Sequence, residues 1–385
     1  MTEWKEYKLG DLTIDGKGSY GIAASAIEFD ASKYTYLRIT DINDDGTINK
    51  NGLKSVDDVN ASNYLLKPND IVFARTGASV GRSYFYDGKD GEFVYAGFLI
   101  KFSIDPNKVN PKILKYYTHS QPYYDWILSV DNGATRGNIN AQTYSSMPII
   151  LPERNIQDKI VSILSSLDDK IDLLHCENKT LEAMAETLFR QWFIEEAKED
   201  WKEGKLGDEF EFIMGQSPSG ESFNEEGVGI PMYQGNADFG FRFPTRRVFT
   251  TQPTRFAEIN DTLISVRAPV GAQNMATEKC CIGRGVAAFR YKDNSSFYSY
   301  TYYKLKSLLD DIKQYNDNGT VFGSISKSDF ENIDIMIPDK DTILNFQKQV
   351  KPIDDKIINN NYEIQTLIQQ RDSLLPKLMS GEVKI

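Results

Sequence analysis

The chain has 385 residues, of which 40% are hydrophobic and 26% are charged, and its net charge is −11. This length leaves room for two domains with ordinary cores, and the composition is typical of a soluble globular protein. No apolar run approaches the roughly 18 residues of a membrane span, and the N-terminus lacks the apolar core of a signal peptide. We therefore expect a cytoplasmic protein with no membrane partner. The negative net charge alone argues against nucleic acid as a partner.

Residues 1–153 are expected to form a mixed α+β domain. Short β-prone runs such as 34–39 and 93–102 alternate with turn signals, and residues 113–117 look helical. The pattern G-x-G-x-x-G at 16–21 lacks the strand before it and the helix after it that a dinucleotide site requires. We interpret that segment as a flexible loop.

Polar clusters follow the β-prone run that begins at Pro68. Arg75-Thr76-Gly77 come first and Val80-Gly81-Arg82 come next. An arginine at the end of a strand beside a glycine-rich turn can approach a phosphate or the edge of a guanine. A structural role explains each such residue equally well. The DNA-contact candidates in this half of the chain are Arg38, Arg75, Thr76, Arg82 and Arg136.

A long helix is predicted next, from Leu167 to about Lys198. Apolar or small residues recur along it four and three positions apart, which is the spacing of a coiled-coil seam. Asn178 interrupts the seam, where a buried polar residue can fix the register. Ser165-Ser166 are predicted N-caps of this helix, and a shorter helical segment is expected at 155–164.

The second half of the chain repeats the first. Residues 132–193 match 318–379 without a gap, and every matched pair is 186 positions apart. Asp168-Asp169-Lys170-Ile171, for example, recur as Asp354-Asp355-Lys356-Ile357. Solenoid repeats have periods of only about 20–50 residues. The sequence therefore predicts a tandem duplication, and hence a pseudo-twofold molecule that reads something with two halves.

Charge is distributed unevenly between the two halves. Residues 229–292 include nine basic and four acidic side chains, a local charge of +5, whereas residues 33–101 are neutral. One basic face on an acidic body is compatible with docking a polyanion in one orientation, although an arginine-rich solvated surface is the alternative. Arginine side chains can hydrogen-bond to the edge of guanine, and Asn and Gln side chains can hydrogen-bond to the edge of adenine. The candidates in this half are Tyr233, Gln234, Asn236, Arg242, Arg246, Arg247, Arg267 and Arg284.

A second long helix is predicted over 353–375, with Pro352 in its first turn and Pro376 stopping or kinking it near Leu375. Its apolar positions keep the register of the first helix, and Asn360 interrupts them at a different level. Neither helix can bury a long apolar stripe in a small domain, so we predict antiparallel pairing; two unrelated surface helices are the alternative. The predicted pairing positions are Leu167, Ile171, Leu174, Leu181, Leu188, Ile353, Ile357, Ile364, Leu367 and Leu374.

No catalytic or metal site is predicted. The sequence contains no Walker-type phosphate loop and no amino-methyltransferase signature. His175 lies beside Cys176 but lacks a further ligand at helical spacing, so a solvated helix position explains it better. The repeated pairs Asp168-Asp169 and Asp354-Asp355 are expected at helix starts, where acidic residues favour the helix dipole.

These features together resemble the specificity subunits of type I restriction–modification systems, over essentially the whole chain. The most specific segments are 147–152, which leads into the first helix, 188–193, which closes it, and 374–382, which closes the second. Residues 215–222 and 229–235 resemble the opening of a common class of target-recognition domain.

The resemblance implies an α+β fold. Two mixed α/β target-recognition domains, related by pseudo-twofold duplication, would be separated by two long antiparallel coiled-coil helices. The recognition domains would be 1–153 and 200–339. The spacer helix regions would be 154–199 and 340–385.

The resemblance also implies a function. Each recognition domain would read one half of a bipartite target in double-stranded DNA. The paired helices would set the spacer and dock two adenine methyltransferase subunits and, through them, restriction subunits. The chain itself would catalyse nothing and bind no cofactor; S-adenosylmethionine, ATP and Mg²⁺ would be used by partner subunits. A coiled-coil adaptor without its own base readout and a self-contained DNA enzyme are the alternatives.

Overall fold

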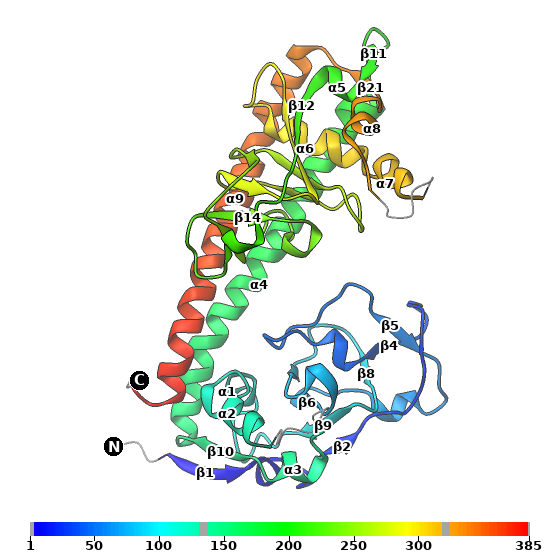
Figure 1. The fold of residues 1–385 in the computed structure, drawn as a ribbon. Coiled ribbons are helices and arrows are strands. Elements are labelled where there is room, and N and C mark those ends of the chain that lie inside the picture. Colours follow the sequence, from blue (N-terminus) through cyan, green and yellow to red (C-terminus); the bar gives the residue numbers. More distant parts are fainter. Residues whose placement is uncertain (1–3, 131–137, 318–323, 384–385) are drawn as a thin grey trace. The chain divides into compact units, whose positions relative to one another are not determined.

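The computed structural model describes residues 4–130, 138–317 and 324–383, which form two compact units (Figure 1). Unit 1 comprises Met1–Leu173 and Glu363–Ile385, and unit 2 comprises Leu174–Tyr362. Each unit therefore takes one part of each long helix. The four consecutive segments expected from the sequence stay a prediction. The candidate Arg136 and the first residues of both repeated segments lie outside the described residues.

The described strands of unit 1 form three sheets, with orders β1-β10, β2-β9-β6-β7 and β3-β5-β4-β8. The strands are β1 (Lys5–Lys8), β2 (Ser19–Tyr20), β3 (Ala26–Ile27), β4 (Tyr34–Leu37), β5 (Lys54–Val56), β6 (Asp70–Ala74), β7 (Ser83–Tyr86), β8 (Phe93–Tyr95), β9 (Leu99–Ser103) and β10 (Pro148–Leu151). The short helices are η1 (Leu9–Leu12), η2 (Ile39–Asp41), η3 (Ala61–Tyr64), η4 (Gly77–Ser79), α1 (Ile113–Tyr117), α2 (Gln121–Val130) and α3 (Ala141–Ser145).

Within the residues described for unit 2, the sheets have orders β11-β21, β12-β20-β17-β18 and β13-β15-β14-β19-β16. The strands are β11 (Lys202–Lys205), β12 (Phe210–Met214), β13 (Phe223–Asn224), β14 (Ile230–Tyr233), β15 (Val248–Thr250), β16 (Phe256–Ala257), β17 (Thr262–Ser265), β18 (Gln273–Met275), β19 (Cys280–Ile282), β20 (Val286–Tyr291) and β21 (Asp334–Ile337). The short helices are α5 (Leu206–Glu209), η6 (Gly220–Ser222), η7 (Asn236–Asp238), α6 (Tyr298–Ser307), α7 (Leu309–Asp317) and α8 (Lys327–Glu331).

The two units share one topology. The order β2-β9-β6-β7 corresponds to β12-β20-β17-β18, and β1-β10 corresponds to β11-β21. Parallel pairing of β4 with β8 corresponds to that of β14 with β19, and unit 2 adds β16 at the edge of that sheet. The predicted fold class, a duplicated α+β chain with two long antiparallel helices, is confirmed. The duplication extends through the regions in which the two sequences differ.

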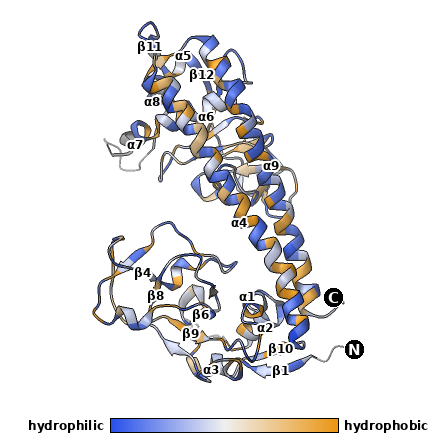
Figure 2. Ribbon diagram, turned by 180° about the vertical axis from the view of Figure 1, so that it is seen from behind, coloured by the Kyte–Doolittle hydropathy of each residue, from blue (hydrophilic) through white to orange (hydrophobic). Residues whose placement is uncertain are grey.

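Both long helices begin earlier than predicted. α4 spans Arg154–Arg190 without a break and continues as one π-helical turn, η5 (Gln191–Glu195), while α9 spans Lys340–Met379. The predicted separate segment at 155–164 is therefore the first part of α4. Polar and apolar residues alternate along these helices, as amphipathic helices require (Figure 2).

The predicted helix starts are wrong, and of the two outcomes predicted for Pro376, a stop or a kink, the stop is wrong. The Ser165 hydroxyl donates to the carbonyl of Val161 inside α4 (2.6 Å), and α9 passes through both Pro352 and Pro376. Val350 and Asp354 on either side of Pro352 are buried. Their packing outweighs the helical hydrogen bond that the proline removes.

The helix seam is more polar than its apolar pattern indicates. Asn178 and Asn360 are both buried, and the Asn360 side-chain amide donates to Asn178 Oδ1 (2.8 Å) and to Glu177 Oε2 (2.9 Å). The two asparagines therefore meet at one level instead of interrupting the seam at staggered levels. Of the predicted pairing positions, Ile171, Leu174, Ile357 and Ile364 are buried, and Leu167, Leu181, Leu188, Ile353, Leu367 and Leu374 are half-buried.

Each unit has its own aromatic core. In unit 1, Phe73 of β6 stacks on Tyr144 of α3, with ring centroids 4.7 Å apart, and the core includes Leu164 of α4 and Leu378 of α9. In unit 2, the ring centroid of Phe193 lies 5.1 Å from that of Tyr300 of α6 and 5.1 Å from that of Phe346 of α9. The long helices are thus part of both cores. No helix in the described ranges combines the length and apolarity that a bilayer crossing needs.

The G-x-G-x-x-G segment is partly a strand and not a flexible loop. Ser19–Tyr20 form β2, which pairs with β9. A Cβ atom added to Gly21 would lie 2.3 Å from the carbonyl oxygens of both Tyr95 and Ala96. Glycine stands there because two backbone segments meet, which is a structural reason unrelated to a dinucleotide.

The asparagine pair predicts a non-additive effect on stability. Asn178→Leu alone should lower the free energy of unfolding by about 1–3 kcal/mol, because the Asn360 amide loses a buried partner. Asn178→Leu with Asn360→Leu should recover most of that loss. Urea unfolding measures both variants, with Asn359→Leu on the exposed face of α9 as the control. A double variant as unstable as the sum of the two single variants contradicts the pairing.

A buried carboxyl in unit 2 predicts a pH dependence. Burial raises the pKa of Glu209 from 4.5 to about 7, despite Lys304 and a hydrogen bond from the Tyr300 hydroxyl (2.9 Å). The folded chain therefore holds a proton that the unfolded chain releases between these pH values, so stability falls as the pH rises from 4.5 to about 7.

Glu209→Gln should remove this loss, which is about 3 kcal/mol at full extent. The variant should match the parent at pH 4 and be more stable at pH 8, as measured by urea unfolding. Glu211→Gln, on the exposed side of β12, serves as the control. A Glu209→Gln variant with the pH profile of the parent would contradict the raised pKa.

Candidate nucleic-acid interface

A depression on unit 2 collects five of the predicted DNA-contact residues. Its volume is about 500 Å³. Loops that follow β14, β17 and β19 form its wall, so residues far apart in the sequence meet there. The predicted residues that line it are Gln234, Asn236, Arg247, Arg267 and Arg284.

The depression carries positive charge that the chain does not neutralise. Arg267 and Arg284 are exposed, and within the described ranges neither guanidinium has a carboxylate partner. Arg247 differs, because it pairs with the buried Asp238 (2.8 Å), which also accepts the Gln234 backbone N–H (2.6 Å). Two free guanidinium groups beside exposed amide side chains can contact phosphates and base edges.

Backbone contacts hold the wall of the depression together. A Cβ atom on Gly285 would lie 2.1 Å from the Gln234 carbonyl oxygen, and one on Gly215 would lie 2.1 Å from that of Gly283. Only glycine permits these approaches. The Arg284 side chain is consequently presented by a turn whose backbone is packed on both sides.

Three other predicted residues of unit 2 lie outside the depression. Tyr233 is only 1% exposed, and burial raises the pKa of its hydroxyl. Arg246 is exposed but pairs with Glu278 (2.6 Å). Arg242 is 2% exposed and lies inside the unit. Burial therefore removes Tyr233 and Arg242 from the DNA-contact candidates, since neither can reach a nucleic acid in this structure.

Arg242 belongs to a buried ionic cluster instead. Its guanidinium donates to Asp354 of α9 (2.8 Å), approaches Glu182 of α4 (3.8 Å) and stacks over the Tyr302 ring at 3.3 Å. The Tyr303 hydroxyl also donates to Asp354 (3.2 Å). Arg242 thus ties a loop of the recognition region to both helices. Sequence reasoning missed this role, because a run of arginines does not show which one has buried acidic partners.

A similar cluster exists in unit 1. Asp168 of α4 accepts from Lys115 (2.7 Å), from the Tyr116 hydroxyl (3.0 Å) and from Arg371 of α9 (3.2 Å). Burial raises the pKa of Asp168, but Lys115 and the hydrogen bonds more than offset this effect and hold the pKa below its usual value. Asp168 and Asp354 are equivalent in the repeat. Both lie in mid-helix, so their predicted role at helix starts is wrong.

The predicted arginines of unit 1 are largely engaged by the chain itself. Arg38 donates to both carboxylate oxygens of Asp41 (2.9 and 2.6 Å), and Arg82 pairs with Asp44 (2.6 Å). Arg75 lies over the Tyr20 ring at 5.0 Å and donates to the Asn138 side chain (3.2 Å). The backbone of Thr76 bridges to Asn138 as well. Among the described residues, the predicted arginines of unit 1 therefore offer less free positive charge than those of unit 2.

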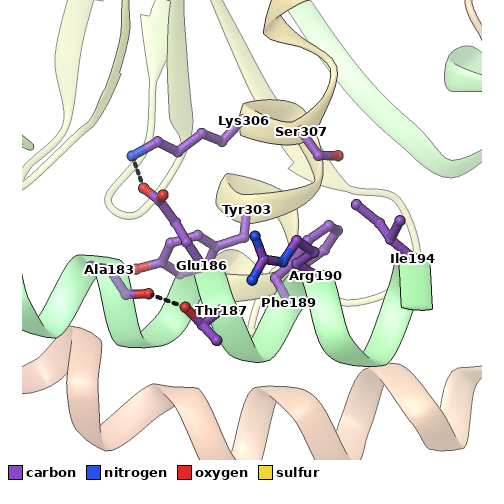
Figure 3. Close-up of a pocket in the computed structure, with 9 residues that line it drawn as sticks. All are labelled: Ala183, Glu186, Thr187, Phe189, Arg190, Ile194, Tyr303, Lys306 and Ser307. Atoms are coloured by element: carbon purple, nitrogen blue, oxygen red, sulfur yellow. Dashed lines mark hydrogen bonds and ion pairs between the residues drawn. The ribbon is translucent and has the colours of Figure 1, made fainter. Parts of the chain in front are cut away.

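A separate groove of about 390 Å³ lies between α4 and α6 (Figure 3). Lys306 and Glu186 form an ion pair at its rim, and Phe189 and Tyr303 lie in its wall. It contains none of the predicted DNA-contact residues. Over the described ranges, no group of three or more His, Cys, Asp or Glu side chains is placed to hold a metal ion.

Comparison with known proteins places the chain in a family. The profile of the type I restriction modification DNA specificity domain matches residues 1–183 and 198–371. The chain belongs to this family. The two matched ranges correspond to the two halves of the duplication.

Individual members of the family match along most of their length. A candidate specificity subunit of the type I restriction enzyme MjaX from Methanocaldococcus jannaschii is 30% identical, over 91% of this chain and 88% of that protein. The type I restriction enzyme HindI specificity subunit of Haemophilus influenzae is 23% identical over the full length of both chains. The crystal structure of a type I restriction–modification S subunit from M. genitalium has a TM-score of 0.57 at 20% identity, covering 98% of this chain and 96% of that one, and shares the fold.

The buried cluster around Arg242 predicts a large cost for removing one member. Arg242→Met should lower the free energy of unfolding of unit 2 by about 3–5 kcal/mol, because Asp354 and Glu182 lose a buried partner. Replacing all three residues by Met, Leu and Leu should recover most of that loss. Arg246→Met, at an exposed ion pair, should cost less than about 1 kcal/mol. Calorimetric or urea unfolding that gives equal losses for both single variants would refute the role assigned to Arg242.

Proposed function

We propose that this chain is the DNA-specificity subunit of a type I restriction–modification complex. Each unit reads one half of a bipartite target in double-stranded DNA. The observation that carries the proposal is the depression on unit 2, where two free arginines lie beside Gln234 and Asn236. Membership of the DNA specificity family supports the same conclusion.

The chemistry of the depression suits a division of tasks. Arginine contacts to phosphates supply affinity and position the protein, whereas contacts to base edges supply specificity. Arg284 and Arg267 have guanidinium groups free for a phosphate or for the O6 and N7 atoms of guanine. Exposed amide side chains at Gln234 and Asn236 have the donor and acceptor pair that adenine requires.

The long helices have a second task in this proposal. They set the length of the unread spacer and dock two adenine methyltransferase subunits and, through them, restriction subunits. S-adenosylmethionine, ATP and Mg²⁺ act in those partner subunits, and this chain performs no catalysis. Cytoplasmic action of the complex is part of the same proposal. An adaptor that binds only proteins would leave the free arginines of the depression without a function.

The two arginines provide the test. Arg284→Gln and Arg267→Gln should each weaken binding to the cognate duplex and lower the slope of log K against log salt by about 1. Arg255→Gln, an exposed arginine outside the depression, should leave that slope unchanged. Binding is measured between 50 and about 200 mM salt with the chain assembled with its methyltransferase subunits, on a duplex chosen by methylome sequencing. Unchanged affinity and slope in both variants would contradict the proposal.

A further inference from the structure

Unit 1 presents an aromatic side chain where unit 2 presents its charged turn. Phe98 lies in the turn between β8 and β9, and its side chain is 59% exposed. Tyr20 of the neighbouring strand β2 is 43% exposed. Isolated exposed aromatic residues are common on proteins, so exposure alone implies nothing. The position of Phe98 in the shared topology is what gives it meaning.

Two glycines establish which residues correspond. The Gly21 backbone N–H donates to the Leu99 carbonyl (3.2 Å), as the Gly215 N–H donates to that of Val286 (2.9 Å). Both glycines lie against a carbonyl of the turn that precedes the paired strand. A Cβ atom added to Gly21 would lie 2.3 Å from the Ala96 carbonyl oxygen, and one added to Gly215 would lie 2.1 Å from the Gly283 carbonyl oxygen. The turn that begins at Ala96 therefore corresponds to the turn that begins at Gly283.

A second pair of hydrogen bonds fixes the register within these turns. The Arg75 backbone N–H donates to the Phe98 carbonyl (3.1 Å), and the Val266 N–H donates to the Gly285 carbonyl (2.9 Å). Phe98 thus stands at the position of Gly285, and the residue before it stands at the position of Arg284. In unit 2 this turn lines the depression that holds the free arginines.

The chemistry of the two turns differs. In unit 2, a side chain at position 285 would meet the Gln234 carbonyl, so the turn projects only Arg284. In unit 1, the turn projects an apolar ring, and the nearby Arg75 is already engaged with Tyr20 and Asn138. Residues 33–101 have no net charge, so apolar contact must contribute more of the interaction there.

We propose that Phe98 is a base-contacting residue of unit 1, which packs against a thymine methyl group in its half-site. The methyl group is the apolar feature of the major groove, and phenylalanine is among the side chains that contact it. Tyr20 is a second exposed aromatic side chain of unit 1, and its hydroxyl accepts the Ala141 backbone N–H (3.1 Å). The inference rests on the proposed function, because it assigns a contact within the DNA-reading surface.

Phe98→Ala is the test variant, and Phe29→Ala is its matched control. Phe29 belongs to the same unit and is 56% exposed, but it lies after the edge strand β3. Both substitutions are at exposed positions, and thermal unfolding checks that the fold is unchanged. Binding is measured for the chain in complex with its methyltransferase subunits. The first half-site is the one that unit 1 reads. Three kinds of duplex are compared: one with both half-sites intact, one with the first half-site scrambled, and a series in which deoxyuridine replaces each thymine of the first half-site in turn.

The expected result has three parts. Phe98→Ala should bind the intact target about 5- to 10-fold more weakly, as loss of one base contact predicts, with an unchanged salt slope. It should bind the scrambled first half-site as the parent does. Deoxyuridine at one position should weaken DNA binding by the parent chain and should not weaken binding by Phe98→Ala any further. Binding by Phe98→Leu should still be weakened by deoxyuridine at that position.

Three results would overturn the inference. They are an unchanged affinity of Phe98→Ala for the intact target, an equal loss on the scrambled first half-site, or a first half-site without an A·T pair. Arg284→Gln separates this failure from failure of the proposed function. If Arg284→Gln lowers the salt slope while Phe98→Ala has no effect, only the assignment of Phe98 is wrong. If neither variant affects binding, the proposed function itself is wrong.

Discussion

Each unit depends on one buried aspartate of a long helix, because a buried carboxylate must keep its charged and hydrogen-bonding partners. Asp168 is held by the Tyr116 hydroxyl and an arginine, and Asp354 is held by the Tyr303 hydroxyl and an arginine. A helix that slid or turned against its recognition region would separate these groups. The two aspartates occupy equivalent places in the repeat, so each recognition region is fixed to the helices in a corresponding way.

With this attachment fixed, the rest of each unit keeps its backbone and varies its side chains. Both units place a glycine, Gly21 or Gly215, where a turn crosses the neighbouring strand. The turn then carries Phe98 in one unit and Arg284 in the other. Loops on a rigid scaffold tolerate substitution. The same backbone can therefore carry DNA-contacting side chains of different chemistry in the two units.

The sequence was sufficient for the features that depend on periodicity. The duplication, the two helices and their antiparallel pairing follow from a spacing that survives along many residues. Features that depend on distant partners could not be predicted. Arg242 pairs with an aspartate 112 positions away, so its run of arginines suggested a surface role. Pro352 suggested a helix start because helix propensity depends on the local sequence alone and does not include the packing of the neighbouring side chains. Phe98 was missed because every candidate was a side chain that can form hydrogen bonds, and a phenylalanine ring cannot.

In the proposed mechanism, the length of the helix pair between the two aspartates sets the distance between the half-sites. Seven residues inserted after Leu173 and seven after Tyr362 preserve the heptad register and lengthen both helices by about 10 Å, or roughly three base pairs. Methylome sequencing of cells that express this variant with the methyltransferase is the most direct measurement. The expected target has both half-sites unchanged and a spacer longer by about three base pairs. An active variant that modifies the original target, with its original spacer, would contradict this mechanism.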